Sequence, residues 1–317
     1  MKKFWIIPCS AAALIAADFA AAGALIRATM IRTPEMADDP KPDDTPAWQE
    51  YYRRAKAGKA WILGQPHENW EITSFDGLHL AAVFLPAEVP TNRTILCVHG
   101  YRANGCFDFG AAAPFLHGLG WNLLLPDDRA HGASEGTFLG FGNLDSVDCV
   151  SWCRELVKKT GSDCRIVLYG ISMGAASVLA ASGDPDLPSE VRAVAADCGF
   201  SSGWAEVKRE LGQMFHLPAF PILPTADLLM RWKAGYSLRE RAAIDRVRNS
   251  KLPLLIIHGT DDTFVPTSMG QEIYEASASP DKHLLLVKGA VHAHSYLTDT
   301  EAYEKAFREL IEKAEET

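Results

Sequence analysis

The sequence has no concentrated run of basic residues. Its 31 Lys and Arg are outnumbered by 40 Asp and Glu, which leaves a net charge of −9. The basic residues occur singly or in short pairs such as Arg53-Arg54. Because nucleic acid is bound by a concentrated positive face, this composition argues against a nucleic-acid partner.

Paired cysteine motifs are also missing. The chain contains 7 cysteines but no Cys-x-x-Cys, so the spacing indicates neither a zinc site nor a redox site. Cys149 and Cys153 are four residues apart on an expected helix, and adjacent turns are poorly placed for an unstrained disulfide. We expect most or all of the cysteines to be free thiols, which suits a reducing compartment.

Long apolar runs are scarce, and the one at the N-terminus stands out. Residues 4–26 follow Lys2 and Lys3, are mostly apolar and contain no Lys or Arg. This length can cross a bilayer, and we expect residues 1–34 to hold a single membrane anchor that places the protein in the cell membrane. The alternatives are a signal peptide cleaved near Ala20-Ala21-Ala22, with secretion, or an apolar helix packed on a cytoplasmic domain.

The rest of the chain alternates between strand and helix patterns. Residues 35–46 hold three prolines and five acids and predict a solvated linker before one domain at 47–317. A helix is expected at 46–64, a hairpin at 70–85, and then apolar strands separated by helices, among them one at 105–117. This order predicts an α/β fold with a mainly parallel sheet and helices on both faces.

Residues 201–247 interrupt this alternation. They separate two strands by far more than an ordinary crossover and contain many apolar residues and several prolines. We expect a small helical cap above the carboxyl ends of the strands, where ligands bind in such sheets. We expect most of its apolar side chains to anchor the cap to the body rather than line a pocket.

A nucleophile pattern lies between a strand and a helix. Residues 170–174 read Gly-Ile-Ser-Met-Gly, with an apolar strand before them and a helical pattern after them, which is typical of a nucleophile elbow at Ser172. A serine needs a base and an acid to react. Loops after two later strands supply Asp261 and Asp262, and then His292 and His294, in the order serine, acid, histidine.

Five blocks in this order resemble one family. They are His99-Gly100-Tyr101, residues 128–136, the elbow, His258-Gly259-x-x-Asp262-x-x-Val265-Pro266 and Gly289-x-x-His292. From Trp70 to the C-terminus the chain resembles the α/β-hydrolase superfamily, and within it the S33 or serine aminopeptidase-like group. It is similar to membrane-anchored bacterial members of unassigned substrate. The resemblance implies the α/β-hydrolase fold with a cap.

The resemblance also implies roles for particular residues. Ser172 would be the nucleophile, His292 the base and Asp262 the acid, although Asp261 and His294 remain the rivals. The backbone N–H groups of Met173 and Tyr101 would stabilise the oxyanion, and no metal or cofactor would be required. His99 would shape the oxyanion loop by hydrogen bonds, and His258 would be structural.

The expected function is therefore a serine hydrolase that cleaves a carboxylic ester or thioester of a small acyl substrate. The first alternative is an aminopeptidase or acyl-peptide hydrolase, which would need carboxylates to hold an amine. Glu206, Glu210 and Asp227 in the cap are candidates for that role. The second alternative is a non-catalytic binding protein on the same fold, although such a protein would usually have lost a triad residue.

Overall fold

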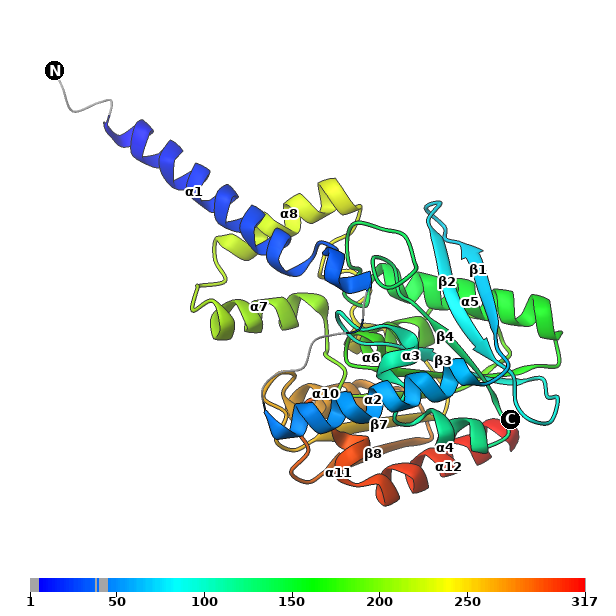
Figure 1. Ribbon diagram of the computed structural model, residues 1–317. Helices are drawn as coiled ribbons and strands as arrows, with labels where there is room; N and C mark the ends of the chain where they lie inside the picture. The colour runs from blue at the N-terminus through cyan, green and yellow to red at the C-terminus, as the bar shows by residue number, and fades with distance from the viewer. Residues whose placement is uncertain (1–5, 38, 40–44, 317) are drawn as a thin grey trace.

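The computed structural model describes residues 6–37, 39 and 45–316. Its centre is an eight-stranded sheet with the strand order β1-β2-β4-β3-β5-β6-β7-β8 (Figure 1). The strands are β1 Glu68–Thr73, β2 His79–Leu85, β3 Arg93–Val98, β4 Asn122–Pro126, β5 Arg165–Ile171, β6 Val191–Asp197, β7 Leu254–Gly259 and β8 Lys282–Val287.

The sheet is mainly parallel, with an antiparallel hairpin at one edge. β1 pairs antiparallel with β2, and β2 pairs antiparallel with β4. Every later pairing, from β4–β3 through β7–β8, is parallel. The hairpin turns at Gly77, whose N–H donates to Ser74 O at 3.1 Å. The predicted α/β fold class is confirmed.

Helices cover both faces of the sheet because successive strand residues point to opposite sides. In β5, Ile166 and Leu168 join one apolar core with α5 (Leu144–Thr160), α6 (Met173–Ser182) and α10 (Thr267–Ala276). Val167 and Tyr169 join a second core on the other face. That face is covered by α2 (Pro46–Gly64), α4 (Ala113–Gly118) and α12 (Thr300–Glu316), as Figure 1 shows.

The prediction of a single helix at 105–117 was wrong. The chain instead forms two short helices, α3 (Gly105–Asp108) and α4, with turns between them. Gly110, in this break, lies so close to α2 that a Cβ there would sit 2.3 Å from Ala55 O. At this point the backbone of Gly110 contacts α2, and the helix is interrupted.

The segment between β6 and β7 is helical in its described residues, with α7 (Gly203–Met214), α8 (Ile222–Ala234) and α9 (Ala243–Arg246). Most of its apolar side chains, among them Val207, Leu211 and Met230, are buried in the main core and anchor the segment, as expected. Six large apolar side chains of the segment are exposed instead. They are Met214, Phe215, Leu217, Phe220, Leu228 and Trp232.

The N-terminal helix α1 (Ile6–Thr29) contains one stretch, Ala12–Thr29, that is long and apolar enough to cross a membrane. Its N-terminal part projects away from the body (Figure 1). Its last turns do not project, because Ala22, Leu25 and Ile26 are buried in the main core. The N-terminal part of α1 thus projects from the domain, and its C-terminal part is packed in the domain core.

The chain after α1 stays attached to the body. Leu139 N–H donates to Met30 O at 3.0 Å and Arg32 N–H donates to Thr137 O at 2.9 Å. Within the expected linker 35–46, Met36 is buried and Asp39 forms an ion pair with Lys59, so these residues are docked rather than solvated. Residues 38 and 40–44 of that linker lie outside the described residues.

Candidate active site

The carboxyl ends of three parallel strands bring the predicted site residues together. Ser172 follows β5, Asp262 follows β7, and His292 follows β8. His292 Nε2 lies 2.8 Å from Ser172 Oγ, and His292 Nδ1 lies 2.8 Å from Asp262 Oδ2. The three side chains, from segments far apart in the sequence, form one hydrogen-bonded chain.

Ser172 lies in a strained turn, as the elbow pattern predicts. Its φ of 54° and ψ of −114° are rare for a residue with a side chain. Gly174 makes the turn possible, because a Cβ there would lie 1.9 Å from Val98 O. The Ser172 N–H donates to Asp197 O at 2.8 Å, and the hydroxyl is held at the start of α6.

Asp262 is the buried acid of the pair, and Asp261 is exposed. Asp262 Oδ1 accepts from the N–H groups of Phe264 at 2.9 Å and Val265 at 2.8 Å. Burial alone would raise the pKa of Asp262, but hydrogen bonds from His258, His292 and Val265 lower it well below its usual range. Asp262 is therefore held as a carboxylate beside His292.

The rival histidine, His294, forms no hydrogen bond with Ser172 in the described part of the chain. Its Nδ1 lies 2.7 Å from His292 O, and its ring packs 4.6 Å from the ring of Trp48 and 5.2 Å from that of Tyr51. It is buried rather than on the surface. His294 thus supports the loop that carries His292.

The two predicted oxyanion donors flank the serine. Met173 begins α6 directly after Ser172, and Tyr101 follows β3. In the described part of the chain, neither N–H has a hydrogen-bond acceptor. The loop around Tyr101 is held on both sides: Gly100 N–H donates to Asp108 Oδ2 at 2.7 Å, and Arg102 N–H donates to His131 Nε2 at 3.1 Å.

His99 and His131 support the loop around Tyr101 through hydrogen bonds. His99 Nε2 accepts from the Asp128 N–H at 2.9 Å, and the two imidazole rings lie 4.9 Å apart. Burial and the neighbouring His99 lower the pKa of His131 well below its usual value, so its Nε2 stays free to accept from Arg102. The expected role of His99, hydrogen bonding within this region, agrees with its contacts.

Sequence reasoning missed Asp197. Its main-chain oxygen accepts from Ser172 N–H, and its carboxylate accepts from Ser295 Oγ at 3.0 Å and Tyr303 Oη at 3.1 Å. It therefore joins the elbow to the segment that follows His292. An acid at the end of an apolar strand, 191–197, was the signal that could have found it.

A cavity of about 260 Å³ opens beside Ser172 and is lined mainly by apolar side chains. Its walls come from α7 and, unexpectedly, from Leu25, Ala28 and Thr29 of α1. The end of α1 is tied to the oxyanion loop, because Tyr101 Oη donates to Thr29 O at 2.9 Å and Arg102 donates to Ala28 O at 2.7 Å.

Two carboxyl groups of α7 also line this cavity. Glu206 is buried, its oxygens have no partner among the described residues, and burial with the nearby Glu210 charge raises its pKa to about 8. Glu210 accepts from Arg209 at 2.8 Å. Asp227, the third candidate, lies elsewhere and accepts from Ser237 Oγ and the Leu238 N–H.

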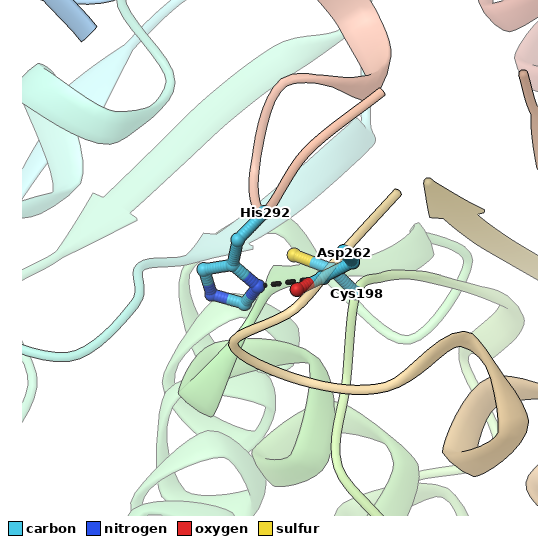
Figure 2. A group of neighbouring side chains, drawn as sticks. All are labelled: Cys198, Asp262 and His292. Atoms are coloured by element: carbon cyan, nitrogen blue, oxygen red, sulfur yellow. Dashed lines mark hydrogen bonds and ion pairs between the residues drawn. The ribbon is translucent and has the colours of Figure 1, made fainter. Parts of the chain in front are cut away.

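Cys198, Asp262 and His292 form a compact group whose potential ligand atoms all lie within 4.8 Å of one another (Figure 2). Burial and the carboxylates of Asp197 and Asp262 raise the pKa of Cys198 well above its usual value. A metal-bound cysteine must be a thiolate, and Asp262 and His292 already pair with each other. The donors therefore fit an acid–histidine pair above a protonated thiol better than a metal site.

Several known proteins are similar to this chain in sequence. The family model for serine aminopeptidase, S33, matches residues 221–300, which hold the loops of Asp262 and His292. YqkD of Bacillus subtilis (strain 168), an uncharacterized protein, is 30% identical over 236 residues, or 74% of each chain. YfhR of Escherichia coli (strain K12), also uncharacterized, is 27% identical and matches 72% of this chain and 74% of its own.

Solved structures show the same architecture. An esterase from Pyrococcus furiosus superposes with a TM-score of 0.65 at 21% identity, over 90% of this chain and 98% of that one. The acylaminoacyl peptidase of Pyrococcus horikoshii superposes with a TM-score of 0.58 at 18% identity, over 80% of this chain and 42% of that one. The chain belongs to the α/β-hydrolase superfamily and is a hydrolase.

Proposed function

We propose that the protein cleaves a carboxylic ester or thioester through Ser172, His292 and Asp262. The observation that carries this proposal is the pair of 2.8 Å hydrogen bonds from Ser172 Oγ to His292 Nε2 and from His292 Nδ1 to Asp262 Oδ2. Such a chain lets the imidazole take the hydroxyl proton while the carboxylate fixes its tautomer.

The reaction proceeds in two halves. Ser172 Oγ attacks the carbonyl carbon as its proton passes to His292 Nε2, and the N–H groups of Tyr101 and Met173 stabilise the oxyanion. The intermediate collapses to an acyl-serine, and His292 returns the proton to the departing alcohol or thiol. A water molecule, deprotonated by His292, then attacks the acyl-serine and releases the acid.

The cavity favours an acyl substrate over an amine. Its lining is mainly apolar, and the pKa of about 8 leaves Glu206 mostly protonated at neutral pH. A neutral carboxyl attracts an ammonium group only weakly, whereas it can share a hydrogen bond with an uncharged ester. These features support the ester over the peptide.

An aminopeptidase is the second candidate, and one observation favours it. Glu206 and Glu210 line the cavity beside Ser172, and Glu206 has no partner among the described residues. Turnover of p-nitrophenyl acyl esters compared with aminoacyl anilides separates the two functions. We expect the esters to be faster; faster turnover of the anilides would reverse the ranking.

A fluorophosphonate probe tests the nucleophile directly. We expect the wild type to be labelled and Ser172→Ala to be unlabelled, while Ser182→Ala, at the other end of α6, keeps its labelling. No labelling of the wild type, or labelling of Ser172→Ala, contradicts the assignment. For the base, we expect His292→Ala to abolish ester turnover, and loss of turnover only in His294→Ala would overturn that choice.

The same proposal places the protein at a membrane through α1. The support is the apolar stretch Ala12–Thr29 and the projection of the N-terminal part of this helix. We expect the full chain to stay in the membrane fraction after high-salt washing. A soluble protein of unshortened mass would contradict the anchor.

A further inference from the structure

Exposed apolar side chains gather around α1 and the cap. Of the fifteen large apolar side chains exposed in the described chain, nine belong to α1 or to the segment from the end of α7 through α8. We call these nine the apolar rim: Leu14, Ile15, Phe19, Met214, Phe215, Leu217, Phe220, Leu228 and Trp232. Such clustering marks an interaction surface rather than the scattered exposure of ordinary surfaces.

The elements of the apolar rim are neighbours in space. α1 packs on α8 (Figure 1). Thr225 Oγ1 donates to Asp18 Oδ2 at 2.5 Å, halfway along α1. This contact brings α8 level with the middle of the apolar helix. A partner that surrounds the first part of α1 therefore meets the cap next.

The length of α1 favours a lipid bilayer as that partner. The part of α1 that precedes Asp18, where α8 begins to cover the helix, is residues 6–17; these twelve residues span about 18 Å. The hydrocarbon core of a bilayer is about 30 Å thick. The projecting part of α1 is therefore shorter than the hydrocarbon core. This difference in length is reduced if the exposed face of the cap is also buried in the bilayer.

The side chains at the edge of the rim have the chemistry of a membrane interface. Trp232 is 79% exposed and lies between exposed Arg231 and Lys233, and Arg27 is exposed near the end of α1. Tryptophan beside basic residues is typical of segments that lie at the boundary of an anionic bilayer. One of these cations, Arg231, also pairs with Glu240 at 2.8 Å.

The cavity beside Ser172 opens into the same surface. Met214 and Phe215 belong both to the rim and to the cavity wall, and Leu25 and Ala28 of α1 form another part of that wall. We infer that the apolar rim docks on a lipid bilayer and that the cavity receives an acyl ester of a membrane lipid from it. This inference rests on the proposed serine hydrolase function and names its substrate class.

The test compares one ester in vesicles with a related ester in water. Full-length protein is reconstituted in vesicles of phosphatidylcholine and phosphatidylglycerol and given either membrane-embedded 4-methylumbelliferyl palmitate or soluble 4-methylumbelliferyl acetate. For the double variant Phe220→Ser, Trp232→Ser, we expect turnover of the palmitate to fall about tenfold or more, because weaker apolar contact lowers docking. Turnover of the acetate stays within about twofold, since neither residue lines the cavity.

A matched control and a direct measurement complete the test. Val89→Ser, which removes an equally exposed apolar side chain outside the rim, leaves both activities unchanged. Lipids with brominated acyl chains quench the fluorescence of the wild type more than that of Trp232→Phe. This second readout does not depend on catalysis.

Equal effects of the double variant on both esters, or equal quenching of wild type and Trp232→Phe, would overturn the inference. If the wild type cleaves neither ester and fluorophosphonate does not label it, the proposed function fails instead.

Discussion

The loop after β7 and the cap helix α7 each hold a buried carboxyl group near Ser172, and their surroundings are opposite. Asp262 is 6% exposed and Glu206 is 4% exposed. Asp262 accepts hydrogen bonds from two backbone N–H groups and His292. Glu206 has no hydrogen-bond partner among the described residues, and the charge of Glu210 raises its pKa by more than the charge of Arg209 lowers it.

The difference shows that partners, and not burial, decide the charge of these groups. Burial raises the pKa of both carboxyls, but the hydrogen bonds at Asp262 reverse the effect and lower its pKa. At Glu206 nothing reverses it, and the pKa rises to about 8. At neutral pH one group is a carboxylate that orients a base, and the other is mostly a neutral acid facing the cavity.

Asp262→Asn should have the largest effect. An amide at this position holds His292 in the wrong tautomer, so we expect kcat for a p-nitrophenyl ester to fall by roughly 10⁴-fold. Asp261→Asn changes an exposed neighbour and should leave kcat near that of the wild type. Equal losses in the two variants would show that the loop as a whole, rather than the paired carboxylate, matters.

Glu206→Gln should have the next largest effect, on stability. Because the folded-state pKa of about 8 exceeds the ordinary value of 4.5, the folded wild type binds more protons than the unfolded chain between these values. Its stability therefore falls as the pH rises from 4.5 to 8, by up to about 1.4 kcal/mol per unit. Glutamine carries no charge and avoids this loss.

Thermal unfolding at pH 5 and pH 9 measures this difference. We expect the difference in Tm between Glu206→Gln and the wild type to shift in favour of the variant from pH 5 to pH 9. The corresponding change in the free energy of unfolding is a few kcal/mol. An offset that is the same at both pH values would mean that Glu206 finds a partner in solution.

Glu210→Gln should have the smallest effect. Burial raises the pKa of Glu210, but Arg209 donates to it at 2.8 Å and opposes that rise. We expect the free energy of unfolding to change by less than about 1 kcal/mol at either pH, because a partly exposed pair contributes little. A pH-dependent shift as large as that of Glu206→Gln would show that position in the cavity, and not the partner, sets the behaviour.

The sequence was sufficient for the order of elements and for the residues at the centre of the site. Residues 46–64 form the expected helix α2, and the strands fall where apolar runs occur. Ser172, Asp262 and His292 each follow a strand, and parallel strands bring their carboxyl ends to one edge. Local patterns and one topological rule are enough to predict that these loops converge, whereas the choice of Asp262 over Asp261 and of His292 over His294 came from the family resemblance.

Other features depend on contacts that no local pattern records. Asp108, His131 and Asp197 support the site through partners on separate elements, such as Gly100, Arg102 and Ser295. Hydropathy predicted that the cap is apolar but not which way its side chains face. The break between α3 and α4 arises from a close approach to α2, which requires both segments to be in place.

The last turns of α1 limit how this protein can be altered. An apolar N-terminal helix is often removed to obtain a water-soluble protein for biochemistry. Removal of the residues before Met30 would delete Leu25, Ala28 and Thr29 from the cavity wall. Tyr101 and Arg102 would also lose the carbonyl groups that they bind. A shortened chain would therefore misreport substrate preference, and the helix is not an exchangeable module.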